Sequence, residues 1–327
     1  MLSRFVAKLF PMSLLLVSFS TFSAHAIIDG NVKSKTDFEI ICESLLDPHK
    51  ALVNLLSEVT DDQALLLMKA NYSELLTWLT QKADATAEGS TTAAKGAYGP
   101  NKDQTPSQFL FGQQITEVDR TAVGFLAIKW LLADDYAAFT HNQPPPVKLS
   151  KESFKQLRSY VKDVLKTTAD VDAMIVMLLT NDLGKVKRYH DITEKAAGRA
   201  IVDHDQVLFT GFTEAAELSP NFMRLPQLQK DWIVDGLLMG SGLNVGQFAQ
   251  AENLPASLNA VKVLTGKPEA FEFKFIELLL DVAGAQGHTD SGTAKAMMEP
   301  VFRNSMFARQ ALLEVIAGKS TREAYDR

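Results

Sequence analysis

The sequence has almost no cysteine and, beyond its first residues, no long apolar run. Cys42 is the one cysteine among 327 residues, so no internal disulfide can form and no cysteine cluster can hold zinc. Basic residues are outnumbered, because 33 Lys and Arg against 39 Asp and Glu give a net charge of -6. These shortages exclude a disulfide scaffold, and we expect no nucleic-acid surface, since such a surface needs positive charge.

Strand signals are scarce as well, because no segment sustains the alternation of apolar and polar residues that half-buried strands show. Apolar residues instead recur at intervals of three and four over 37–82, which indicates amphipathic helices. Further helices are expected over 118–139, 193–217, 225–239, 244–251, 256–265, 269–284 and 293–317. The run 173–179 is apolar on all sides and is expected in the core. The sequence therefore predicts an all-α, multi-helix globular bundle with an N-terminal helical extension.

The first 26 residues have the pattern of an export signal. Arg4 and Lys8 precede a short apolar run, and Ala24 and Ala26 supply the small residues that signal peptidase needs. The run is too short for a comfortable membrane-spanning helix. We expect a cleaved chain without a membrane span, located in a bacterial periplasm or outside the cell.

Composition divides the rest of the chain into three predicted parts. Residues 27–82 form an N-terminal helical segment. Residues 83–107 are small and polar, which is typical of a flexible loop or linker. Residues 108–327 form the main helical domain.

One motif carries information about function. Residues 174–185 read MIVMLLTNDLGK, an apolar helix that ends in Asn181-Asp182, an aliphatic residue, Gly184 and Lys185. This segment resembles the HD-domain superfamily of metal-dependent phosphohydrolases, in which such a helix ends in a His-Asp pair followed by an aliphatic residue, Gly and Lys. In this chain Asn181 replaces the His, and the region 153–160 lacks the family's upstream His.

The resemblance implies a helical domain that holds a divalent metal and uses it to activate a water molecule against phosphorus. Asp182 matches the Asp of the pair, His204 lies where a further His often stands, and Asp281 matches the family's final Asp on a late apolar helix. Lys185 would contact a phosphate as a point charge. These residues are the predicted core of the site.

Other nearby residues offer a different set of ligands. Asn181 supplies only a neutral carbonyl oxygen, whereas His190, Asp191 and Asp205 add an imidazole and two carboxylates. Sites rich in carboxylates favour hard ions such as Mg²⁺, Mn²⁺ or Ca²⁺, and imidazole also suits Fe and Zn. The sequence does not decide among these metals.

Three functional hypotheses follow from the sequence. The first is an exported, divalent-metal-dependent hydrolase of a phosphate ester with a nucleotide-like substrate. The second is a catalytically degenerate protein of the same fold that acts by binding. The third is an unrelated helical secreted protein that works through a protein partner.

Overall fold

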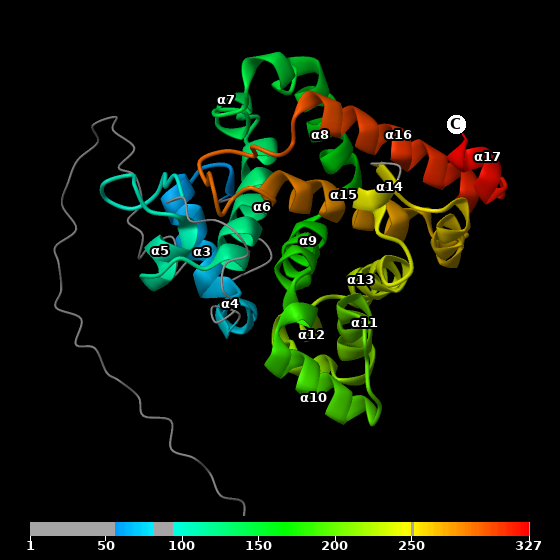
Figure 1. Ribbon diagram of the computed structural model, residues 1–327. Coiled ribbons are helices and arrows are strands. Elements are labelled where there is room, and N and C mark those ends of the chain that lie inside the picture. The colour runs from blue at the N-terminus through cyan, green and yellow to red at the C-terminus, as the bar shows by residue number, and fades with distance from the viewer. Residues whose placement is uncertain (1–55, 82–93, 250–251, 327) are drawn as a thin grey trace, which may run out of the picture. The chain divides into compact units, whose positions relative to one another are not determined.

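The computed structural model describes residues 56–81, 94–249 and 252–326, and helices make up nearly all regular structure in these residues (Figure 1). The all-α prediction is confirmed. The strand-like pairings in this part of the chain are two isolated bridges, which join Lys95 to Asp290 and Tyr98 to Gln104. The expected signal segment 1–26 and Cys42 lie outside the described residues.

The helices keep the labels of Figure 1. The first group consists of α3 (Asp61–Asn71), α4 (Ser73–Thr80), α5 (Pro106–Phe111), α6 (Thr116–Leu132), α7 (Tyr136–Phe139), α8 (Lys151–Val164) and α9 (Thr168–Thr180). The second group consists of the short 3₁₀ helix η3 (Leu183–Lys185), α10 (Lys187–Ala197), α11 (His204–Glu214), α12 (Pro220–Met223), α13 (Gln227–Gly240), α14 (Val245–Ala249), the 3₁₀ helix η5 (Pro255–Leu264), α15 (Pro268–Gly284), α16 (Glu299–Ile316) and α17 (Thr321–Tyr325).

Helix α9 is the buried helix that the sequence predicts. The Thr167 side chain caps its start by accepting a hydrogen bond from the Asp170 backbone N–H, and the Asp170 carboxylate accepts one from the Thr167 backbone N–H. Such a capping box satisfies two backbone donors that the helix itself leaves unpaired. Every residue from Asp170 to Thr180 is buried, so the C-terminal end of α9 is held firmly in the core.

The expectation of one helix over 193–217 is wrong. Gly198 has a φ of +66° and ends α10 in the left-handed conformation that favours glycine. Asp203 then caps α11 by accepting hydrogen bonds from the backbone N–H groups of Asp205 and Gln206. His204 is therefore the first residue of a helix and does not lie in the middle of one.

Three further helix expectations differ from the structure. The helix expected over 293–317 begins only at Glu299, as α16. The helix expected over 118–139 is divided into α6 and α7, because Asp134 takes a φ of +60° between them. The segment expected as a helix over 256–265 forms the 3₁₀ helix η5.

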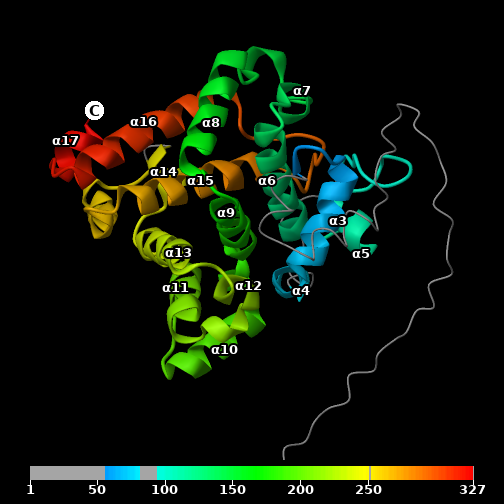
Figure 2. The same ribbon diagram turned by 180° about the vertical axis from the view of Figure 1, so that it is seen from behind.

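Helices α6 and α15 cross near the centre of the ribbon, as Figures 1 and 2 show from opposite sides. Glycines allow their backbones to meet. A Cβ atom on Gly284 of α15 would lie 2.2 Å from the carbonyl oxygen of Arg120 in α6, and one on Gly124 of α6 would lie 2.9 Å from the carbonyl oxygen of Leu280. The crossing therefore depends on the absence of side chains at these two positions.

The described part of the N-terminal segment packs against the domain predicted over 108–327. Helices α3 and α4 both contact α6, and the Trp130 indole of α6 donates to the Asp61 carboxylate at 3.1 Å. Residues 94–105, which belong to the predicted loop 83–107, run beside the 289–291 segment. There the buried Tyr98 hydroxyl donates to the Ser291 carbonyl at 2.5 Å.

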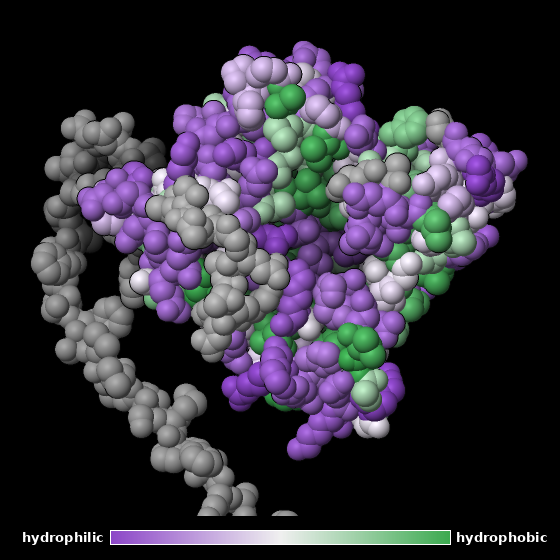
Figure 3. Space-filling view, in the orientation of Figure 1, coloured by the Kyte–Doolittle hydropathy of each residue, from purple (hydrophilic) through white to green (hydrophobic). Residues whose placement is uncertain are grey.

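Hydrophilic residues cover most of the face in Figure 3, and apolar side chains reach it in separate groups. The large apolar side chains exposed among the described residues are Val202, Met223, Leu228, Leu238, Leu254, Val263 and Phe307. None of the described helices is long and apolar enough to cross a membrane.

Replacing Gly284 by Ala is expected to destabilise the fold by about 3 kcal/mol, because the new methyl group must push the backbones of α6 and α15 apart. The measurement is urea unfolding followed by circular dichroism. Gly240→Ala is the matched control, since its Cβ would meet Lys274 Cε at an ordinary 3.6 Å, and its effect should stay within about 1 kcal/mol. Equal stability losses in the two variants would contradict the close crossing.

Candidate functional site

A cavity of about 290 Å³ collects most of the residues that the sequence predicts as a site. It lies where the end of α9 and η3 meet the start of α11, the turn from α13 to α14, and the middle of α15, with Arg120 of α6 at one wall. The predicted residues that line it are Asn181, Asp182, Lys185, His204, Asp205 and Asp281.

Gly184 explains how η3 reaches α11. A Cβ atom at this position would lie 2.0 Å from the backbone carbonyl oxygen of His204, so only glycine permits the contact. The close approach places Asp182 and Lys185 beside the first turn of α11, which carries His204 and Asp205. The glycine of the sequence motif therefore has a packing role that the site depends on.

Asp182 is buried, with 3% of its surface exposed. Its carboxylate accepts a hydrogen bond from the Lys185 ammonium three residues later. Burial alone would raise the pKa of Asp182, but its hydrogen bond with Glu117 and the charges of Lys185 and Arg120 together lower it. Asp182 is therefore an ionised carboxylate at neutral pH, held by a lysine at the cavity wall.

Glu277 is a second buried carboxyl of the cavity, and it pairs with Lys274 one turn earlier on α15. Its Oε1 atom is buried without a hydrogen-bond partner. Burial raises the pKa of Glu277, and the nearby Asp182 and Asp205 raise it further, while Lys274 opposes them. An orphaned buried carboxylate oxygen is costly, so this atom is a point where a bound cation would be stabilised.

Asp281 lies one turn beyond Glu277 on the same helix and is partly exposed to the cavity. Burial, with the negative charges of Glu277 and Asp182, raises the pKa of Asp281 to about 7, although Arg120 and Lys274 act in the opposite direction. A carboxyl that titrates near neutral pH can give or take a proton under physiological conditions.

His204 and Asp205 stand nearer to solvent. The His204 side chain is 45% exposed, and its Nε2 atom lies 3.4 Å from the Asp205 carboxylate. Burial raises the pKa of Asp205, while the charges of His204 and Lys274 lower it. Among the described residues, one group of acidic and histidine side chains is close enough to share a metal ion. It consists of Asp203, His204 and Asp205, whose ligand atoms all lie within 4.8 Å of one another. Asp182 and Asp281 share the cavity with His204 but are outside that group.

His190 is not part of the cavity. Its Nε2 atom lies 2.7 Å from the Ile201 carbonyl oxygen and 3.3 Å from the Glu194 carboxylate. These contacts link α10 to the turn that precedes α11. The predicted role of His190 as a metal ligand has no support from this geometry, and a structural role explains its contacts.

Three charged residues of the cavity were missed by sequence reasoning: Arg120, Lys274 and Glu277. Arg120 stands in a helix that otherwise reads as core, and Lys274 and Glu277 have the spacing of an ordinary surface ion pair on a helix. Glu277 could have been predicted as a site residue from the sequence, because it is a charged residue within the apolar run 275–280 and lies one helical turn before Asp281.

The donor set fits a hard divalent cation in its chemistry. Asp182, Asp205, Glu277 and Asp281 offer the carboxylate oxygens that Mg²⁺, Mn²⁺ and Ca²⁺ prefer, and the orphaned Glu277 Oε1 is a ligand atom already desolvated. Two of these carboxylates are bound to lysines, however. A cation would have to compete with Lys185 and Lys274 for them.

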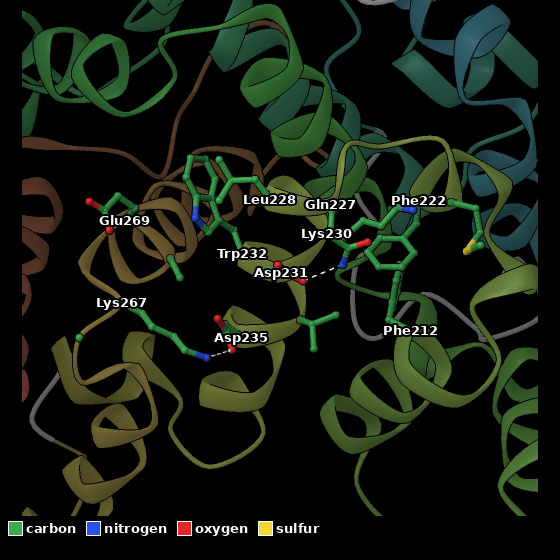
Figure 4. Close-up of a pocket in the computed structure, with 14 residues that line it drawn as sticks. Phe212, Phe222, Gln227, Leu228, Lys230, Asp231, Trp232, Asp235, Lys267 and Glu269 are labelled. Carbon is green, nitrogen blue, oxygen red and sulfur yellow. Dashed lines mark hydrogen bonds and ion pairs between the residues drawn. The ribbon is translucent and has the colours of Figure 1, made fainter.

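A larger cavity of about 600 Å³ lies along α13 (Figure 4). Trp232 lies on one side of it and Phe212 and Phe222 on the other, while Lys267 pairs with Asp235 at 2.7 Å. It contains none of the predicted site residues. Size alone does not make it the better candidate, because it lacks a group of buried, unsatisfied polar atoms.

Comparison with known proteins gives a family but no activity. A model described as a family of unknown function, DUF6829, matches residues 65–327. The chain belongs to this family. No curated protein and no solved structure matches the chain. The DUF6829 match includes every residue that lines the smaller cavity, and the resemblance to HD-domain phosphohydrolases remains a prediction.

In metal-free protein, Asp281→Asn should be stabilising, and more so at high pH. The pKa of Asp281 is near 7 in the folded state, above its unfolded value of 3.8. Between pH 3.8 and about pH 7 the folded state therefore binds a proton that the unfolded state has lost. The wild-type fold therefore loses stability as pH rises through this range, and the amide avoids that loss. Urea unfolding with a chelator present should give the variant an advantage about 2 kcal/mol larger at pH 8 than at pH 5. The same advantage at both pH values would contradict the raised pKa.

Proposed function

We propose that the chain is an exported hydrolase of a small phosphate ester that depends on a divalent cation. The observation that carries this proposal is the cavity in which four carboxyl groups face three cationic side chains: Asp182, Asp205, Glu277 and Asp281, with Arg120, Lys185 and Lys274. Phosphate hydrolysis needs both kinds of group, because carboxylates hold the metal and cations bind the ester.

Asp182, Glu277 and Asp281 would hold the cation, and Asp205 and His204 would complete the set from the start of α11. A bound cation lowers the pKa of a coordinated water and so supplies a nucleophile at neutral pH. The carboxylate-rich donor set favours Mg²⁺ or Mn²⁺ over softer metals.

The chain's own residues bind and orient the substrate. The charges of Arg120 and Lys185 both act on Asp182, and both residues line the cavity, so they can hold the oxygens of a phosphate group beside the metal ligands. Arg120 also pairs with Glu117 at 3.3 Å. The cavity volume of about 290 Å³ suits a small ester better than a polymer.

The second candidate is a binding protein without catalysis on the same fold. It is favoured by two ion pairs, Lys185 with Asp182 and Lys274 with Glu277. These pairs already neutralise the two most buried of the four carboxyl groups that line the cavity. Such a protein would bind an anion through Arg120 without needing a metal.

The test is a panel of phosphate monoesters, diesters and nucleotides, assayed with Mg²⁺, Mn²⁺ or Ca²⁺ and with a chelator. We expect hydrolysis that needs the metal, and a loss of about 100-fold in Asp182→Asn. The matched control is Asp191→Asn, because Asp191 is an exposed acid on α10 paired with Lys187 outside the cavity. Its rate should equal that of the wild type.

The outcomes separate the two candidates. Binding of phosphate in the presence of chelator, without hydrolysis under any condition, would favour the binding protein. Equal activity in Asp182→Asn and Asp191→Asn would contradict both, since it would place the chemistry outside this cavity.

A further inference from the structure

The two buried ion pairs of the cavity each join a carboxylate to a lysine three residues away in the sequence. Lys185 follows Asp182 by three residues, and Lys274 precedes Glu277 by three. In each pair the carboxylate side chain is almost fully buried, at 4% and 2% exposed, whereas the lysine is more accessible, at 33% and 13%. The carboxylates are fixed by the fold, and the lysines are the partners with room to move.

Each lysine occupies only one oxygen of its carboxylate. Lys185 binds Asp182 Oδ1, and Lys274 binds Glu277 Oε2, which leaves Glu277 Oε1 buried without a hydrogen-bond partner. The neighbouring Asp281 has a pKa raised partly by the charges of Glu277 and Asp182. The lysines therefore compensate the acidic cluster only in part.

A divalent cation that binds these oxygens would repel both ammonium groups at short range. Lysine carries its charge on a flexible four-carbon stem, so the ammonium groups can leave the carboxylates and remain in the cavity. Once displaced, they would be unpaired positive charges beside the metal, in the cavity that Arg120 also lines while it pairs with Glu117 at 3.3 Å. An anion that enters the same cavity would then bind to them.

We propose that Lys185 and Lys274 are displaceable counter-ions that couple the binding of a divalent cation to the binding of an anion. Without ligands they neutralise Asp182 and Glu277. The cation takes over the carboxylates, and the freed lysines bind the anion. The choice of these two ligands rests on the proposed function, but the coupling does not need catalysis.

Coupling of this kind must be reciprocal. If Mg²⁺ tightens phosphate binding, phosphate must tighten Mg²⁺ binding by the same factor. We expect a factor of about 10, within the usual range for coupled sites. A rigid site in which the lysines stay on their carboxylates would show no such dependence.

The experiment is isothermal titration of the intact protein with Mg²⁺ alone, with inorganic phosphate alone, and with each in the presence of the other. Association of Mg²⁺ with phosphate is measured without protein and subtracted. The wild type should show the reciprocal gain of about 10-fold.

Lys185→Met is the main variant, because it removes the ammonium and keeps the apolar stem. With its competitor gone, Mg²⁺ alone should bind more tightly than to the wild type, phosphate should bind more weakly, and the coupling should fall below about threefold. Lys185→Arg should restore phosphate binding. Lys187→Met is the matched control, since Lys187 is 86% exposed and pairs with Asp191 outside the cavity; it should behave as the wild type.

Three results would overturn the proposal. The first is the absence of coupling in the wild type although both ligands bind. The second is weaker Mg²⁺ binding in a folded Lys185→Met, checked by circular dichroism. Absence of binding by either ligand would also overturn it, together with the proposed function. Coupled binding without hydrolysis of any ester would leave the coupling intact and refute only the proposed hydrolase.

Discussion

The close crossing of α6 and α15 is the contact on which the cavity depends. Gly284 meets the backbone of Arg120, and Gly124 meets that of Leu280, so the two helix backbones touch without side chains between them. Arg120 lies one turn before Gly124, and Asp281 lies three residues before Gly284. The crossing thus brings the guanidinium of one helix within electrostatic reach of the carboxyl groups of the other.

Charge balance is the second constraint, and it follows from the first. Helix α15 carries Glu277 and Asp281 at the crossing, while η3 brings Asp182 to the same place. Ionised carboxylates cannot be buried together without partners. Asp182 takes Lys185 and Glu277 takes Lys274, and Asp281 remains as the group whose pKa rises to about 7. The repulsion among these carboxylates is therefore relieved in part by protonation of Asp281 near neutral pH.

Much of the fold could be predicted from the sequence, because apolar spacing and capping residues act locally. The buried helix at 173–179 and the all-α class follow from such patterns. The turn between α10 and α11 was missed, since the left-handed conformation of Gly198 leaves no mark in the apolar pattern. Asp182, His204 and Asp281 were placed together by family resemblance, and they do line one cavity.

Other features of the site depend on tertiary contacts that one sequence does not reveal. Lys274 and Glu277 have the spacing of a solvent-exposed helical pair, but Glu277 is buried in the fold, where α6 and α13 pack against α15. His190, conversely, has the residue type of a metal ligand, but it contacts the Ile201 carbonyl and does not line the cavity. Residue type alone does not separate a ligand from a packing contact; the burial of its neighbours does.

The two lysines also stabilise the folded cavity when no ligand is bound. Without Lys274, Glu277 would be a buried charge with no ion-pair partner, at a cost of several kcal/mol. Without Lys185, Asp182 would keep only its hydrogen bond with Glu117 and the charge of Arg120. With both lysines, the chain can fold in the absence of a metal. In the proposed site the same pairs would weaken the binding of a cation, because the cation would first have to replace an ammonium group. Folding stability and the affinity for a cation would therefore oppose each other at Lys185 and Lys274, and the greater exposure of Lys185 would make it the easier of the two to displace.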